Sequence, residues 1–165
     1  MKKQLLHSGW QLTTVGKNDT IPATVPGSVY NDLLNAGRME DPYWRDNEMK
    51  ALALMDEDYR YNTTFDVNAD VLNSERVLLR CEGLDTIADI VLNGEKIASV
   101  CNMHRTWEFD VKDSLKTTGN TLEIVFHSPT KYIKEQDKIC HAGGSDEAMV
   151  GFPNLRNCLL YTSPS

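Results

Sequence analysis

Short runs in which apolar and polar side chains alternate are the feature that most constrains how this chain can fold. The run over residues 59–67, Tyr-Arg-Tyr-Asn-Thr-Thr-Phe-Asp-Val, places its aromatic side chains on one side of a period-two pattern and predicts a half-buried strand. Residues 86–92 form a second run that leads into Asn93-Gly94, a strong signal for a two-residue hairpin turn, and residues 96–100 return from it. The chain therefore favours antiparallel sheets over helices.

Further elements can be placed by the same reasoning. Strands are expected over residues 10–15, 77–81, 106–111 and 121–127. The centre of the chain, from residue 77 to residue 100, is interpreted as an antiparallel meander. Ser28 is expected to cap a short helix that ends before Gly37, and residues 113–116 form a short polar or helical link. Short strands at this spacing are typical of an all-β sandwich with one or two short helices.

Composition excludes several classes of protein. A chain of 165 residues with 41% hydrophobic and 25% charged content fits one soluble domain, and no apolar run approaches the roughly 20 residues that span a bilayer. The net charge is −7 and the basic residues are scattered, so we expect neither a nucleic-acid partner nor a membrane. The first residues contain no secretory stretch, so we expect a cytoplasmic protein with reduced cysteines, Cys81 being a buried thiol.

One segment is specific enough to indicate a family. Residues 81–94, Cys-Glu-Gly-Leu-Asp-Thr-Ile-Ala-Asp-Ile-Val-Leu-Asn-Gly, resemble the segment Gly-Leu-Asp-Thr-x-Ala with a following Asn-Gly turn in the sandwich domains of family 2 glycoside hydrolases. Further segments occur in the order expected of the β-mannosidase branch. These segments are residues 25–30, 41–48, 59–61 before 64–65, 102–103 before Trp107, and 151–156. The last of them resembles the stretch that leads toward a Trp-Asp-Trp substrate loop.

The resemblance implies a fold and a function. The implied fold is a jelly-roll β-sandwich of the galactose-binding-domain-like type. The implied protein is a retaining β-mannosidase that hydrolyses terminal non-reducing β-D-mannose residues without a cofactor, and this chain resembles its N-terminal, non-catalytic domain. The expected partners are a manno-oligosaccharide, bound through the absent catalytic domain, and the protein's own catalytic barrel in cis. We expect the domain to cover residues 1–157. Residues 158–165 resemble translated sequencing-adapter read-through, although a natural short tail is the alternative.

No catalytic residue can be assigned. Retaining glycosidases need two carboxyl groups about 5 Å apart, and in family 2 both are glutamates at strand ends of the barrel. None of the acids in this chain matches those motifs, and Asp56-Glu57-Asp58 is interpreted as a solvated turn. There is no nucleophile elbow and no glycine-rich phosphate loop, and Cys140 beside His141 lacks a visible orienting partner. The four histidines show no metal-binding spacing, so neither a metal nor a cofactor is expected.

One loop can reach a sugar. In family 2 relatives, a sandwich loop before the strand equivalent to 59–67 lends a polar residue to the edge of the active-site pocket, and residues 41–48 occupy that position. We predict that Trp44 offers an apolar face to a sugar ring and that Asn47 hydrogen-bonds a hydroxyl group. The alternative is that Asp46 or Asn47 caps a helix over residues 49–54, with Trp44 packed against the sandwich. Trp10 and Trp107 are expected to serve core or interdomain packing.

Two other functions remain open at this stage. The same architecture hosts free-standing carbohydrate-binding modules, so fold alone does not separate a module from an enzyme domain. Residues 151–156 favour the enzyme domain, because such a segment has no purpose in a solitary module. A family 2 β-galactosidase or β-glucuronidase is the other alternative, and residues 25–30 and 41–48 favour a β-mannosidase over both.

Overall fold

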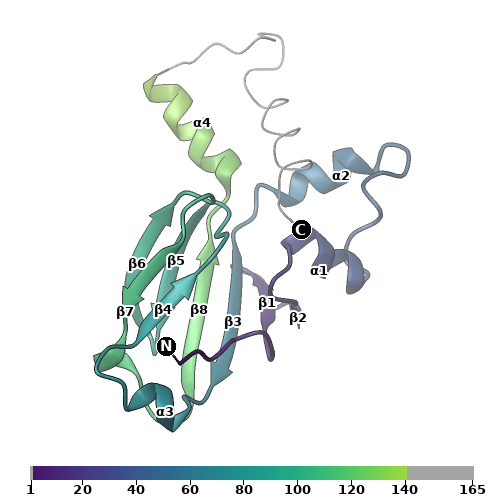
Figure 1. The fold of residues 1–165 in the computed structure, drawn as a ribbon. Coiled ribbons are helices and arrows are strands. Elements are labelled where there is room, and N and C mark those ends of the chain that lie inside the picture. The colour runs from purple at the N-terminus through teal and green to yellow at the C-terminus, as the bar shows by residue number, and fades with distance from the viewer. Residues whose placement is uncertain (1, 141–165) are drawn as a thin grey trace.

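The computed structural model describes residues 2–140 and shows two layers of antiparallel sheet (Figure 1). The larger sheet has six strands in the spatial order β2-β1-β3-β8-β5-β6. These strands are β1 (Gln11–Thr14), β2 (Thr20–Pro22), β3 (Tyr59–Phe65), β5 (Ile87–Leu92), β6 (Glu95–Cys101) and β8 (Asn120–Phe126). The second layer consists of two strands, β4 (Leu78–Cys81) and β7 (Trp107–Asp110). The expected all-β sandwich is confirmed.

The connectivity differs from the meander expected between residues 77 and 100. The hairpin between β5 and β6 is confirmed, with Asn93 at φ 53° and Gly94 at φ 84°, both in the left-handed region that this turn requires. However, β4 leaves for the second layer and pairs with β7, while the other neighbour of β5 is β8. Alternation specifies which side chains face inward, but it does not specify which strands become partners.

The core lies between the two layers. One row of inward side chains crosses five strands of the large sheet in register, from Leu12 through Tyr61, Ile124 and Ile90 to Ala98. The smaller layer covers this row with buried side chains from β4 and from the segments that flank β4 and β7. The buried apolar residues of this part of the chain are Val77, Cys81, Leu84 and Val111. The predicted burial of the Cys81 thiol is confirmed, and this burial raises the pKa of the thiol to about 11.

The predicted packing roles of two tryptophans also hold. Trp10 is 6% exposed, and its indole Nε1–H donates to the carbonyl of Leu6 at 2.7 Å. Trp107 is half-buried against the core and lies parallel to Phe109, with ring centroids 6.5 Å apart. The guanidinium of Arg105 lies 4.4 Å from the centroid of the Trp107 ring.

The first expected helix is present as α1 (Val29–Asn35), and it is attached to the large sheet. The Ser28 hydroxyl accepts the backbone N–H of Asn31 at 3.3 Å, as a helix cap does. The buried carboxylate of Asp32 accepts the Tyr61 hydroxyl at 2.8 Å and the backbone N–H of Thr24 at 3.0 Å. These two hydrogen bonds join α1 to β3 and to the loop before α1.

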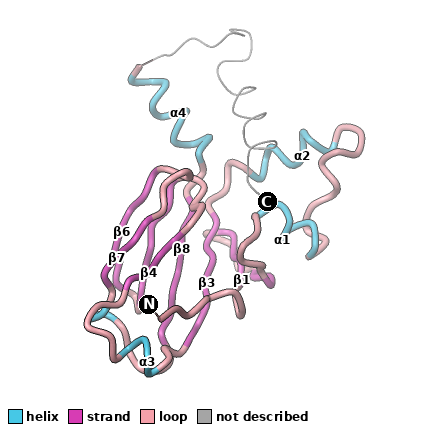
Figure 2. The backbone as a smooth tube through the Cα atoms, viewed as in Figure 1, coloured by secondary structure: helices cyan, strands magenta, loops and turns pink. Residues whose placement is uncertain are grey.

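Other helices surround the sandwich (Figure 2). They are α2 (Asn47–Leu54), α3 (Ala69–Leu72), the 3-10 helix η1 (Lys112–Ser114) and α4 (Pro129–Ile139). The helix over residues 49–54, which the sequence offers only as an alternative, is present as part of α2, and η1 lies at the expected link, whereas α3 and α4 are not predicted from the sequence. A signal for α4 was available, because Ser128-Pro129 combines a capping residue with proline at the first helical position. In Figure 1, α1 and α2 lie beside the β1 side of the sandwich, and α4 extends from one end of it.

Candidate functional site

The predicted sugar-contacting loop, residues 41–48, folds back on itself immediately before and within the first turn of α2. The Asp41 carboxylate accepts the backbone N–H of Tyr43 at 2.9 Å, and its carbonyl accepts the backbone N–H of Trp44 at 3.1 Å. Asn47 is the first residue of α2, and its side-chain amide donates to the same Asp41 carbonyl at 3.1 Å. The loop is therefore a closed turn with a defined shape.

Trp44 and Tyr43 project from this turn into solvent. The exposed fractions are 64% for Trp44 and 73% for Tyr43, and the guanidinium of Arg45 lies 5.7 Å from the centroid of the Trp44 ring. The alternative in which Trp44 packs against the sandwich is therefore wrong. Asp46 occupies the cap position of α2, but its side chain makes no cap hydrogen bond. An exposed aromatic ring beside a polar turn can stack on a sugar face.

Asn47 also lines a groove that opens between the segment after α1 and the side of α2. Its walls combine apolar side chains with two cationic residues and one acidic residue. The lining residues are Arg38, Met39, Glu40, Asn47, Lys50, Ala51 and Leu54. The charges are paired, since Lys50 contacts Glu40 at 2.5 Å and Arg38 contacts Asp19 at 2.9 Å. Such a groove offers hydrogen-bond donors and acceptors to a neutral polar ligand without presenting a large net charge.

The far end of α2 is held by hydroxyl groups from other elements. The phenol of Tyr30 in α1 donates to the carbonyl of Ala51 at 3.1 Å, and the phenol of Tyr59 in β3 donates to the carbonyl of Leu54 at 3.0 Å. Burial raises the pKa of Tyr30 to about 12, and burial with the nearby Glu57 raises that of Tyr59 further. Both phenols therefore stay protonated donors at neutral pH.

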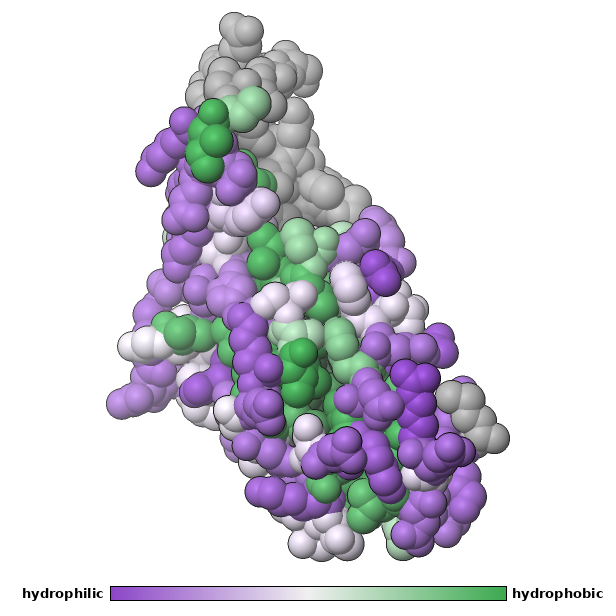
Figure 3. Space-filling view, turned by 90° about the vertical axis from the view of Figure 1, so that its left-hand side faces the viewer, coloured by the Kyte–Doolittle hydropathy of each residue, from purple (hydrophilic) through white to green (hydrophobic). Residues whose placement is uncertain are grey.

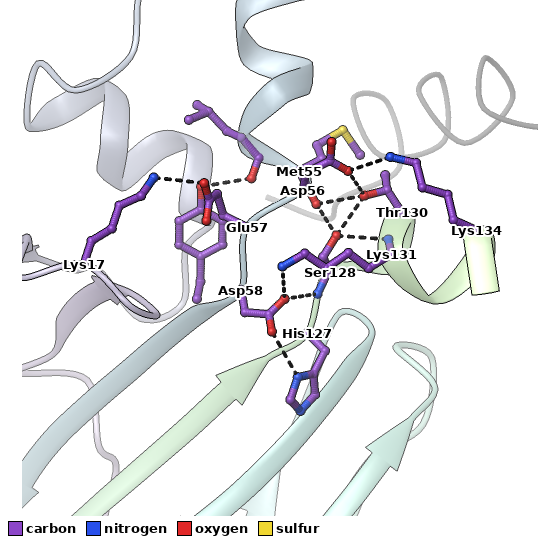
Figure 4. Close-up of polar contacts among 12 residues, drawn as sticks. Lys17, Met55, Asp56, Glu57, Asp58, His127, Ser128, Thr130, Lys131 and Lys134 are labelled. Atoms are coloured by element: carbon purple, nitrogen blue, oxygen red, sulfur yellow. Dashed lines mark hydrogen bonds and ion pairs between the residues drawn. The ribbon is translucent and has the colours of Figure 1, made fainter. Parts of the chain in front are cut away.

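The acidic turn after α2 forms a second polar cluster, shown in Figure 4. Asp56 accepts the Thr130 hydroxyl at 2.6 Å and the Lys134 ammonium group at 3.1 Å. Asp58 accepts the backbone N–H of Ser128 at 2.9 Å and the Lys131 ammonium group at 3.3 Å. The predicted turn is present, but its carboxylates are not simply solvated, since those of Asp56 and Asp58 pair with the start of α4 and that of Glu57 pairs with Lys17. The sequence could not show the pairing with α4, because these partners lie 70 to 78 positions further along the chain.

Two common kinds of site are not found in the described part of the chain. Within residues 2–140, no three His, Cys, Asp or Glu side chains gather closely enough to hold a metal ion. No helix there has the length and apolar character needed to cross a membrane. Cys140 is the last described residue, and His141, the next residue in the sequence, lies outside the described range. The segments over residues 151–156 and 158–165 lie outside it as well.

Comparison with known proteins now assigns the family. The family profile described as glycosyl hydrolase 2 galactose-binding domain-like matches residues 10–155. The chain belongs to this family. The resemblance inferred from residues 81–94 is thereby confirmed. The family assignment is also consistent with the observed two-layer β-sandwich.

Individual members of the family extend far beyond the matched region. A β-mannosidase from Bos taurus is 31% identical over 133 residues, which cover 81% of this chain and 15% of the relative. The crystal structure of a β-D-mannosidase from Dictyoglomus thermophilum superposes with a TM-score of 0.81 at 36% identity, covering 86% of this chain and 18% of that one. A β-D-glucuronidase from the same organism superposes with a TM-score of 0.55 at 18% identity and shares the fold alone. The chain thus spans about one sixth of the length of the mannosidases it matches.

Proposed function

We propose that this chain is the N-terminal, non-catalytic domain of a retaining β-mannosidase that hydrolyses terminal non-reducing β-D-mannose residues. The observation that carries the proposal is the superposition with a TM-score of 0.81 and 36% identity on the Dictyoglomus thermophilum β-D-mannosidase. A sequence identity of 36% over 86% of this chain supports common ancestry of this domain and the corresponding domain of that mannosidase. The two reacting carboxylates would lie on the barrel that follows, and this domain would support the barrel in cis.

The mannoside assignment is preferred to other family 2 activities. The glucuronidase match has half the sequence identity and a much lower TM-score, which argues against a β-glucuronidase. The domain is proposed to end at residue 157, with residues 158–165 outside it. A reducing, cytoplasmic location is proposed, because the cysteines in the described range are unpaired.

Within the complete enzyme, the loop over residues 41–48 is proposed to reach the edge of the mannose pocket. Trp44 would lie against the apolar face of a sugar ring, and Asn47 would hydrogen-bond a hydroxyl group. The exposure of Trp44 and the position of Asn47 on the groove beside α2 support this role. The substrate would be a manno-oligosaccharide, and no cofactor would take part.

The first test uses the 165-residue chain alone. It should not hydrolyse an aryl β-mannoside, because binding without a pair of reacting carboxylates does not cleave a glycosidic bond. The measurement is release of the chromophore against a buffer blank after two independent purification steps. Turnover that survives repurification at constant specific activity would contradict the proposal. Tight mannoside binding by a soluble, monomeric chain would instead favour a free-standing binding module.

The second test concerns Asn47 in the longer enzyme, obtained by reading the coding DNA beyond codon 157. Asn47→Ala should lower kcat/KM by about 5- to 150-fold, because a buried partner left unpaired costs about 1–3 kcal/mol in the transition state. The matched control is Asn31→Ala, which removes an exposed amide from α1 and should leave kcat/KM unchanged. Unchanged kinetics with a lowered Tm for Asn47→Ala would mean that Asn47 only shapes the loop.

A further inference from the structure

Three carbonyl groups at the C-terminal end of α2, those of Ala51, Leu54 and Met55, accept hydrogen bonds from side-chain hydroxyl groups of other elements. A helix leaves its last four carbonyls without internal partners, and these usually bind water or local backbone groups. Here Tyr30 of α1 binds the Ala51 carbonyl, and Tyr59 of β3 binds the Leu54 carbonyl. The Met55 carbonyl accepts the Thr130 hydroxyl at 3.1 Å and also the hydroxyl of Ser128 (Figure 4). We call these four hydroxyl groups the hydroxyl cage of α2.

Apolar packing of α2 is concentrated in its C-terminal half, where Leu54 lies against the core as a partly buried side chain. Among its eight residues, Ala51 is the buried one. Helices of this length are marginal in water without tertiary support. The opposite end of the helix carries Asn47 and the exposed turn with Trp44. The hydroxyl cage is therefore a main constraint on where that turn lies.

We infer that Tyr30 and Tyr59 are positioning residues, which set the place of Asn47 through α2 without touching the sugar themselves. The helix is about 10 Å long, so a tilt of about 10° at the caged end moves the other end by roughly 2 Å. A displacement of 1 Å is enough to weaken a hydrogen bond aimed at a ligand. The part of this inference that concerns sugar recognition rests on the proposed function, whereas the part that concerns the orientation of α2 does not.

The first experiment measures how firmly α2 is held in the 165-residue chain. Tyr30→Phe and Tyr59→Phe each remove one hydroxyl group and keep the ring. Hydrogen–deuterium exchange of the Asn47 and Met49 amides, which close the first turn of α2, should accelerate by about 3- to 10-fold, because losing one such hydrogen bond costs about 1 kcal/mol. The matched control is Tyr132→Phe on α4, whose side chain is 45% exposed. Exchange at these two amides that matches the control would overturn the inference.

The second experiment separates positioning from a general loss of stability in the longer enzyme. Tyr30→Phe should raise KM by about 3- to 10-fold per folded molecule with a smaller change in kcat. In the double variant with Asn47→Ala, the effect should be no larger than that of Asn47→Ala alone, because both act through the same contact. Additive effects would overturn the inference. If Asn47→Ala itself leaves kcat/KM unchanged while amide exchange still accelerates in the tyrosine variants, the proposed sugar contact fails and the positioning of α2 stands.

Discussion

At the scale of single residues, two asparagine side chains add hydrogen bonds to the backbone pairing where the strands end. Asn120 is fully buried at the start of β8. Its Nδ2 donates to the Lys116 carbonyl at 2.7 Å, and its Oδ1 accepts the backbone N–H of Lys116 at 2.8 Å and the side-chain amide of Asn93 at 3.0 Å. Asn93 in turn accepts the backbone N–H of Thr121 at 3.0 Å. The two asparagines thus attach the hairpin turn to the neighbouring strand.

Removing the central amide of this network should destabilise the domain. Asn120→Ala removes three hydrogen bonds to Asn93 and Lys116 and leaves a cavity at a fully buried position, so we expect the free energy of unfolding to fall by about 2–4 kcal/mol. The measurement is urea unfolding followed by far-UV circular dichroism. The control is Asn31→Ala on the exposed side of α1, where alanine is the better helix former and should change stability by less than about 0.5 kcal/mol. Equal stability of the two variants would contradict the prediction.

Asp89 is the residue whose titration should be visible in the acid stability of the fold. Burial raises the pKa of its carboxyl group, but hydrogen bonds from Lys96, Ser99 and His127 outweigh burial and lower this pKa to about 2. The corresponding distances are 2.8, 2.6 and 3.1 Å. Because the unfolded chain takes up the proton first as pH falls, the stabilisation is complete above about pH 4 and is lost between about pH 4 and 2.

Asp89→Asn should therefore lower the unfolding free energy at pH 6 by about 1 kcal/mol and flatten its decline between pH 5 and pH 2.5. Urea unfolding at a series of pH values measures both quantities. Asp113→Asn, at an exposed position in η1, serves as the control and should keep the parent's pH dependence. A parallel decline in the Asp89 variant and the parent would show that this carboxylate does not contribute to the acid sensitivity.

At the scale of elements, α4 is attached to the sandwich by polar contacts at its first turns. No residue of α4 is buried, and Ile139 near its far end is 79% exposed. Hydrogen bonds from the backbone of Ser128 and from Lys131, aided by His127, hold the pKa of Asp58 below its usual range despite burial that opposes the shift. The place of α4 in the molecule is thus decided mainly by its N-terminal end.

Weakening the polar contacts at the N-terminal end of α4 should make the whole of α4 open more readily. Asp58→Asn removes the charge that binds Lys131 and weakens the bond to the Ser128 N–H, so amide exchange in the first two turns of α4 should accelerate by about 5-fold or more at neutral pH. Exchange in β3 and β8 should change much less, since those strands pair along seven residues. Uniform acceleration across sheet and helix would indicate global destabilisation instead.

At the scale of the whole molecule, apolar surface remains uncovered on the isolated domain. On the α1 and α2 side, exposed fractions reach 39% for Leu34, 73% for Tyr43, 64% for Trp44 and 62% for Met49. Figure 3 shows a second apolar area, a strip between hydrophilic margins on the side where β6 and β7 lie. Uncovered apolar surface of this kind promotes association.

The 165-residue chain alone should therefore self-associate as its concentration rises. Analytical ultracentrifugation over a hundredfold concentration range would measure the average mass. The variant Trp44→Ser with Met49→Ser should associate less, whereas Tyr132→Ser with Ile139→Ser on α4 controls for a general gain in polarity. A parent chain that stays monomeric throughout would contradict the prediction and favour a self-sufficient binding module.

The sequence by itself determined the hairpin turn, the family and every strand of the described range except β2. Alternation over residues 59–67 and the Asn93-Gly94 turn are local signals, because the side-chain period and the left-handed backbone depend on neighbouring residues only. The segment at residues 81–94 was sufficient for the family assignment, which the profile match over residues 10–155 confirms.

Only the tertiary structure decided which strands become partners and what surrounds the candidate site. Three sets of contacts join residues far apart in the chain: the pairing of β4 with β7, the bonds of Tyr30 and Thr130 to the end of α2, and the bonds of Asp56 and Asp58 to the start of α4. Such contacts depend on the packing of whole layers, for which a single sequence carries no periodic signal. For the same reason the sequence allowed Trp44 either to face a sugar or to pack against the sandwich, and only the fold shows that its side chain is exposed near Asn47.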